Sequence, residues 1–235
     1  MAYRDFSYPK VLSQLGLSAQ DADRGSAAAQ LPVSAGFVAF LEAGLAIAVG
    51  DLGASTEKAK SEFIIAPMLI ELRRAMGQRF SVVSGMELNV NKGRKLNGAC
   101  DFVLTKGANQ HLREAPIVGV LEAKNEERSW HGLGQLVAAM FGAQLRNQKA
   151  GRSVARVCGA LTTGRSWQFL HLEGSVLTLD RTSYQVRDLP KVMGILKRQI
   201  ERALKPTERV GGEAALNAVG QPNAARGPAL SSPPS

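Results

Sequence analysis

Apolar positions at helical spacing are the first pattern that the chain shows. Four segments repeat apolar residues every three to four positions, which is typical of an amphipathic or buried helix. In the second segment Ser55 is the expected N-cap, Pro67 is expected to kink the helix, and Gly77 to end it. The four predicted helices cover residues 33–50, 55–76, 132–149 and 189–205.

Between these helices the period changes, and β-branched and aromatic residues become frequent. Such runs, bounded by turn-forming residues, predict strands. The last run contains Glu173-Gly174, which predicts a turn within it. The predicted strands cover residues 79–90, 99–106, 116–124, 155–164 and 166–180. Helix, three strands, helix, strands and helix in this order predict one α/β domain with a mixed central β-sheet flanked by helices.

Both ends of the chain differ from this central part. Residues 1–32 are polar and rich in Ala and Ser, which predicts a loosely attached segment. We therefore interpret residues 1–50 as an N-terminal extension with one helix and residues 51–205 as the main domain. Residues 206–235 have almost no large apolar side chains. They cannot bury enough surface to offset their ordering entropy, so we expect a disordered tail.

The apolar segment 33–50 raises the question of a membrane span. Glu42 lies in its middle, and Ala and Gly, which contribute little transfer energy, supply much of its length. A half-buried helix is the better interpretation. The N-terminus shows no signal-peptide pattern, so we expect a cytoplasmic protein without stable membrane association. A membrane-surface protein that uses segment 33–50 and the basic helix 189–205 is the least favoured hypothesis.

The charge of the chain indicates a class of partner, and its cysteine and histidine content argues against a zinc site. The 29 Lys and Arg residues exceed the 20 Asp and Glu residues, for a formal net charge of +9. This excess suits a polyanion, above all nucleic acid. Cys100 and Cys158 lie in apolar runs and are expected to be reduced and buried. Together with His111, His131 and His171 they fit no common zinc-ligand spacing.

Charged residues in two apolar strands are the candidate site. The run 116–121 is apolar at consecutive positions, which indicates a central strand covered on both faces, and it leads into Glu122 and Lys124. These two side chains share a face because they are two positions apart. Asp101 begins another apolar run. If the two strands are neighbours, Asp101 and Glu122 converge, and two carboxylates with open positions suit Mg²⁺. Lys124 could then orient an attacking water.

At these residues the chain resembles the PD-(D/E)XK nuclease superfamily. The resemblance rests on Asp101, then Glu122-Ala-Lys124, with Cys100 where the motif has its proline. It implies a restriction-endonuclease-like core over residues 55–180. It also implies that Glu62, in the preceding helix, and Gln135, in the following helix, belong to the site. By this resemblance Asp101, Glu122 and Glu62 would bind Mg²⁺, which Mn²⁺ can replace, Lys124 would assist the water and Gln135 would support the site.

Two hypotheses from different classes follow. The leading one is a Mg²⁺-dependent nuclease acting on DNA, in restriction and defence or in repair, with a homodimer or an accessory subunit left open. The alternative is a non-catalytic nucleic-acid-binding or assembly module on the same fold, because fold alone does not guarantee activity. Seven basic residues are candidates for the flanks of a phosphate-binding groove. They are Lys92, Arg94, Lys95, Arg146, Lys149, Arg152 and Arg156.

Overall fold

The fold is that of a computed structural model, which describes residues 2–23, 27–50, 56–107, 115–125, 129–152 and 154–205. The described residues form a seven-stranded sheet with the order β1-β7-β6-β5-β4-β3-β2. The strands are β1 (Ser18–Ala22), β2 (Phe80–Glu87), β3 (Ala99–Lys106), β4 (Ile117–Ala123), β5 (Val157–Thr162), β6 (Ser166–Glu173) and β7 (Val176–Gln185). The main helices are α1 (Tyr8–Leu15), α2 (Ala35–Val49), α4 (Ala66–Ala75), α5 (Ser129–Lys149) and α6 (Leu189–Leu204).

The sheet is mixed, as the sequence predicted. Strand β4 runs parallel to β5 and antiparallel to β3, and β1 runs parallel to β7. The predicted hairpin between β6 and β7 is also confirmed, because Gly174 turns the chain at a φ of 58°. All seven residues of β4 are buried, in agreement with its predicted place in the middle of the sheet. The α/β class and the helix-flanked sheet are therefore confirmed.

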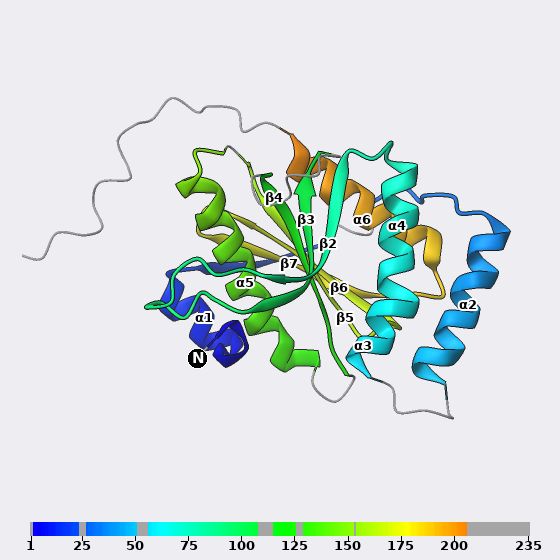
Figure 1. Cartoon of the computed structure of the whole chain (residues 1–235), viewed down its shortest axis with the longest axis horizontal. Coiled ribbons are helices and arrows are strands. Elements are labelled where there is room, and N and C mark those ends of the chain that lie inside the picture. The colour runs from blue at the N-terminus through cyan, green and yellow to red at the C-terminus, as the bar shows by residue number, and fades with distance from the viewer. Residues whose placement is uncertain are drawn as a thin grey trace, which may run out of the picture.

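Helices cover both faces of the sheet (Figure 1). Helices α1 and α5 lie on one face, and α2, α4 and α6 lie on the other. Each face has its own cluster of buried apolar side chains, so the sheet is the middle of three layers. Cys100 and Cys158 are free and buried, as predicted. The described residues contain no helix that is both long enough and apolar enough to span a membrane.

The second predicted helix is built from three pieces. A short helix α3 (Glu57–Lys60) leads into a π-helical turn η2 (Ser61–Ile65), and α4 follows directly. Its N-cap is Thr56, whose side chain accepts a hydrogen bond from the Ala59 N–H, while the predicted cap Ser55 lies outside the described residues. Pro67 stands in the first turn of α4, right after the π turn, and Gly77 ends the helix at a φ of 61°.

The prediction of a loosely attached N-terminal segment is wrong. A 3₁₀ turn η1 (Tyr3–Asp5) and helix α1 place Tyr3, Phe6 and Val11 in the core under α5. Strand β1 then pairs with β7 at the edge of the sheet. Tyr8, Val11, Leu12 and Leu15 follow helical spacing and pack toward α5, so the sequence held a short helical signal that the polar composition of the segment obscured. The predicted disordered tail, residues 206–235, lies outside the described residues.

Candidate active site

The three charged residues predicted to converge do so at the end of β4. Val103 on β3 and Val120 on β4 both belong to the apolar cluster under α5. Asp101 lies two residues before Val103 on its strand, and Glu122 lies two residues after Val120. Because side chains two apart on a strand share a face, Glu122 faces the α5 side of the sheet, where it contacts Gln135. Asp101 lies on the neighbouring strand, close enough for its charge to act on Glu122.

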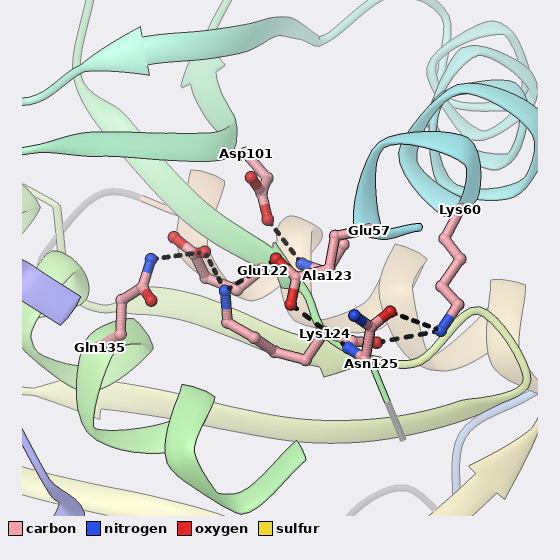
Figure 2. Close-up of polar contacts among 8 residues, drawn as sticks. All are labelled: Glu57, Lys60, Asp101, Glu122, Ala123, Lys124, Asn125 and Gln135. Carbon is pink, nitrogen blue, oxygen red and sulfur yellow. Dashed lines mark hydrogen bonds and ion pairs between the residues drawn. The ribbon is translucent and has the colours of Figure 1, made fainter. Parts of the chain in front are cut away.

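Where the backbone pairing between β3 and β4 ends, the side chain of Asp101 accepts the next hydrogen bond from β4. The last paired residues in this direction are Phe102 and Leu121. Beyond them, the Asp101 Oδ2 atom accepts a hydrogen bond from the Ala123 N–H at 2.7 Å (Figure 2). This contact fixes the carboxylate of Asp101 beside the residue that follows Glu122. The Asp101 side chain remains half-buried, so part of it faces the open end of the sheet.

Glu122 is the most deeply buried acid of the group. Its side chain is 1% exposed, and its Oε2 atom accepts a hydrogen bond from Gln135 Nε2 at 2.9 Å and lies 3.5 Å from Lys124 Nζ. The other oxygen, Oε1, is buried and has no hydrogen-bond partner. The pKa of Glu122 is raised to about 8, with burial as the main cause; the charge of Asp101 acts in the same direction, and Lys124 opposes the shift. A buried carboxylate oxygen without a partner is costly unless a cation or a proton satisfies it.

Lys124 reaches the site by lying along the first turn of α5. Its backbone N–H is held by the Thr162 carbonyl at 2.8 Å, which anchors the residue to β5. A Cβ atom on Gly132 would come within 2.6 Å of Lys124 Cγ and 2.9 Å of Leu161 Cδ1. Only a residue without a side chain leaves room there for the lysine stem. Gly132 is therefore a structural requirement of the site that the sequence alone did not reveal.

The acidic residue contributed by the preceding helix is Glu57, and the prediction that Glu62 has this place is wrong. Glu57 Oε2 lies 3.7 Å from Lys124 Nζ, and its Oε1 atom accepts a hydrogen bond from the Asn125 N–H at 3.3 Å. The Glu62 side chain is 51% exposed and pairs with Lys58 at 2.7 Å.

A signal for Glu57 was present in the sequence. Glu57 lies three positions before the buried Lys60 and seven before the buried Ile64, on the stripe of the helix that faces the protein. Glu62 lies beside Phe63, off this stripe, and Phe63 is exposed as well. The buried stripe therefore distinguishes the two acids, whereas their separation in sequence from Asp101 and Glu122 does not.

A buried lysine of helix α3 contacts the residues that follow β4. Lys60 Nζ lies 3.4 Å from the Lys124 carbonyl oxygen and 3.4 Å from Asn125 Oδ1 (Figure 2). Its side chain is 1% exposed. Helix α3 thus holds the residues after β4 at two points, through Glu57 and Lys60. This fixes the backbone of Lys124 while its ammonium group is held by the two glutamates.

An open cleft gives access to the group. It measures about 680 Å³ and brings together residues from the N-terminal turn, α3, β2, β3, the end of β4 and α5. Three carboxylates and two cations line it. They are Glu57, Glu87 and Asp101, and Arg4 and Lys124. Gln135 also lines the cleft, so four of the five predicted site residues gather in or directly beneath it, and Glu62 does not.

The donor set fits a hard divalent cation that keeps several of its waters. Among the described residues, no group of three or more His, Cys, Asp and Glu side chains is arranged to hold a metal ion. Asp101 and Glu122 supply two carboxylates, and Mg²⁺ commonly uses one or two together with water and substrate phosphate. The partnerless Glu122 Oε1 is the observation that favours such an ion.

Several other candidates do not line the cleft. Arg156 pairs with Glu173 at 2.9 Å, Lys149 donates to the Val90 carbonyl, and Arg94 lies over the ring of Phe141. Gln135 and Lys149 are fourteen positions apart on α5, which corresponds to about 21 Å along the helix. Any groove that includes these basic residues would therefore extend well beyond the cleft. His111 lies outside the described residues.

Comparison of the sequence with protein-family models and with curated proteins finds no match in either set. The functional argument therefore rests on the geometry of the site.

Proposed function

We propose that the protein is a metal-dependent nuclease that hydrolyses phosphodiester bonds, with DNA as its substrate. The observation that supports this most is the convergence of Asp101, Glu122 and Lys124 at the end of a fully buried strand, beneath an open cleft. Placing two acids and a lysine there costs desolvation energy, and a structural protein has little reason to bear that cost.

The resemblance of this arrangement to the PD-(D/E)XK superfamily supports the same reaction. The acid of one strand, the Glu-Ala-Lys triplet of its neighbour and the glutamine of the next helix come together in the order that the resemblance implies. On this proposal the sheet and its helices are a restriction-endonuclease-like core. The net charge of +9 favours a nucleic acid as substrate, and two free buried cysteines are compatible with a reducing cytoplasm.

Each residue has a role in the proposed reaction. Asp101 and Glu122 would hold the Mg²⁺ ion, which lowers the pKa of a bound water and neutralises developing charge on the phosphate. Lys124, whose Nζ lies 3.5 Å from Glu122, would orient the attacking water and stabilise the extra negative charge of the transition state. Gln135 holds Glu122 in place through its 2.9 Å hydrogen bond, and Glu57 holds Lys124. These contacts position the groups before the substrate arrives.

Cleavage assays on the purified full-length chain test the proposal. We expect cutting of DNA that requires Mg²⁺ or Mn²⁺, and we expect Asp101→Ala and Lys124→Ala to reduce it by at least about a hundredfold. Lys58→Ala is the matched control for charge, because Lys58 pairs with Glu62 on the exposed face of the helix. Equal cutting by wild type and both site variants would overturn the assignment. DNA binding without any cutting would favour the non-catalytic module.

A further inference from the structure

The N-terminal turn forms one wall of the cleft, and the protein holds this turn firmly. The Tyr3 N–H donates to the Asn97 carbonyl at 3.0 Å, just before the strand that carries Asp101. Within the turn, the Ala2 N–H donates to Asp5 Oδ2 at 2.7 Å. Tyr3 and Phe6, on either side of the exposed Arg4, are both buried. The backbone of Arg4 is therefore anchored on both sides.

Helix α5 is shaped to accept this turn. A Cβ atom on Gly134 would collide with the Phe6 carbonyl, and a Cβ atom on Gly142 would collide with the Tyr3 hydroxyl. The turn thus lies against the same helix that carries Gln135, one position from Gly134. Residues that the sequence pattern placed outside the main domain are part of the site's architecture, and they are fixed relative to it.

Arg4 brings an uncommitted positive charge to this wall. Among the described residues that line the cleft, the cations are Arg4 and Lys124. Lys124 lies within 4 Å of two glutamates, whereas no described carboxylate forms an ion pair with the exposed Arg4. Three carboxylates share the cleft with them, so an entering polyanion needs additional positive charge.

We propose that Arg4 binds a backbone phosphate of the nucleic acid, next to the phosphodiester at the Asp101–Glu122–Lys124 group. This inference rests on the proposed function, and it assigns the N-terminal turn a part in substrate binding. A guanidinium group suits the task because its planar fork can donate two parallel hydrogen bonds to one phosphate. Its anchored backbone reduces the entropy lost on binding. Arg4 is a binding residue and takes no part in proton transfer.

The test measures the affinity of the full-length protein for a labelled DNA duplex as a function of salt, with Ca²⁺ in place of Mg²⁺ to hold the cleft charge without cutting. We expect Arg4→Ala to weaken binding about tenfold, and to make the slope of log K against log salt shallower by about 0.9, the value for one lost phosphate contact. Arg4→Lys should restore the slope but only part of the affinity, because an ammonium group lacks the planar fork.

Arg181→Ala is the matched control. Arg181 is an exposed arginine on β7, three strands away from β4 in the sheet, and its loss changes the net charge equally. An equal effect of Arg4→Ala and Arg181→Ala would overturn the inference, as would the absence of DNA binding by the wild type. A loss specific to Arg4, in a protein that cuts nothing with Mg²⁺, would support the inference and overturn the nuclease. Cutting by the wild type without an Arg4-specific loss of affinity would support the nuclease and overturn the inference about Arg4.

Discussion

At the scale of single residues, the site is dominated by the burial of Glu122. Its side chain is almost inaccessible, one of its oxygens has no hydrogen-bond partner, and its pKa is raised to about 8. Burial favours the neutral, protonated form of Glu122. The charged form is stabilised by Lys124 and would be stabilised further by a bound cation. Proton binding and metal binding at this residue are therefore expected to compete.

This competition predicts how stability depends on pH. Without metal, the folded protein keeps a proton on Glu122 that the unfolded chain releases near pH 4.5. The free energy of unfolding should therefore fall as pH rises from about 5 to about 8, by at most about 1.4 kcal/mol per pH unit, and the loss should level off above that range. Glu122→Gln, which is neutral at every pH, should remove this part of the dependence. Chemical denaturation in EDTA at several pH values measures it, and parallel profiles for the two proteins would contradict it.

Metal addition should act in the opposite direction. A divalent cation binds the charged form of Glu122, so it stabilises the fold by mass action and does so more strongly at high pH. We expect saturating Mg²⁺ to raise Tm more at pH 8 than at pH 6, and to leave the Tm of Asp101→Ala nearly unchanged. Thermal unfolding with and without Mg²⁺ checks this. A Tm increase of equal size in wild type and Asp101→Ala would place the ion elsewhere.

The two acids of the second helix should differ in their effect on activity. Glu57→Gln removes a charge that holds Lys124 Nζ, at 3.7 Å, so we expect metal-dependent cleavage to fall by about tenfold to a hundredfold. Glu62→Gln changes only an exposed pair with Lys58 and should leave cleavage within about twofold. Steady-state kinetics of both variants decide between the two acids. A larger loss of cleavage in Glu62→Gln would show that Glu62, and not Glu57, faces Lys124 in the active protein.

At the scale of elements, the site depends on how closely α5 approaches the end of β4. Gly132 permits this approach, because a side chain there would meet Lys124 and Leu161. The helix α3 closes the opposite side through Glu57 and the buried Lys60. The consecutive elements β4 and α5, together with the distant helix α3, therefore determine where one ammonium group lies.

Gly132→Ala should consequently lower the activity of a protein that still folds. The added methyl group overpacks the contact at a cost of about 1–3 kcal/mol and displaces the Lys124 stem from its present path. Gly36→Ala in α2 is the control, since a Cβ atom there would meet nothing within 4 Å. It should leave activity unchanged and stability equal or slightly higher. Full activity in a folded Gly132→Ala protein would contradict the positioning role of the helix contact.

At the scale of the whole molecule, the N-terminal segment contacts both α5 and the edge of the sheet. Its turn lies against α5 and hydrogen-bonds to Asn97, and its strand β1 extends the sheet at β7, the far end from β2 (Figure 1). Tyr3 lies between Gly98, just before β3, and Gly142 of α5, and it is 1% exposed. Stability of the molecule should therefore depend on this residue, despite its position near the chain end.

Two substitutions at Tyr3 separate packing from hydrogen bonding. Tyr3→Ala should lower the free energy of unfolding by about 3 kcal/mol, as is typical of aromatic residues removed from a core. Tyr3→Phe should be nearly neutral, because the buried hydroxyl group has no hydrogen-bond partner to lose. Denaturant titration of both variants measures this difference. A loss below about 0.5 kcal/mol in Tyr3→Ala would support the loosely attached segment that the sequence pattern suggested.

Local patterns in the sequence predicted most of the elements and the central residues of the candidate site. Apolar periodicity identified the strands from β2 to β7 and the helices α2, α4, α5 and α6, but not α1, because periodicity records which faces of an element are buried. Charges at the ends of apolar runs identified Asp101, Glu122 and Lys124, since such charges need partners. Gln135 followed from the resemblance, and its contact with Glu122 agrees with it.

The residues that complete the site come from distant parts of the chain, and their places follow from the packing of the fold. The space at Gly132 and the anchored turn that carries Arg4 depend on how separate elements approach one another. The apolar stripe of the helix already favours Glu57 over Glu62, but the contact of Glu57 with Lys124 depends on this approach as well. Strand β1 finds its partner β7 near the other end of the domain. Local patterns record the environment of neighbouring residues, whereas these contacts arise from packing between elements, which no short stretch of sequence specifies.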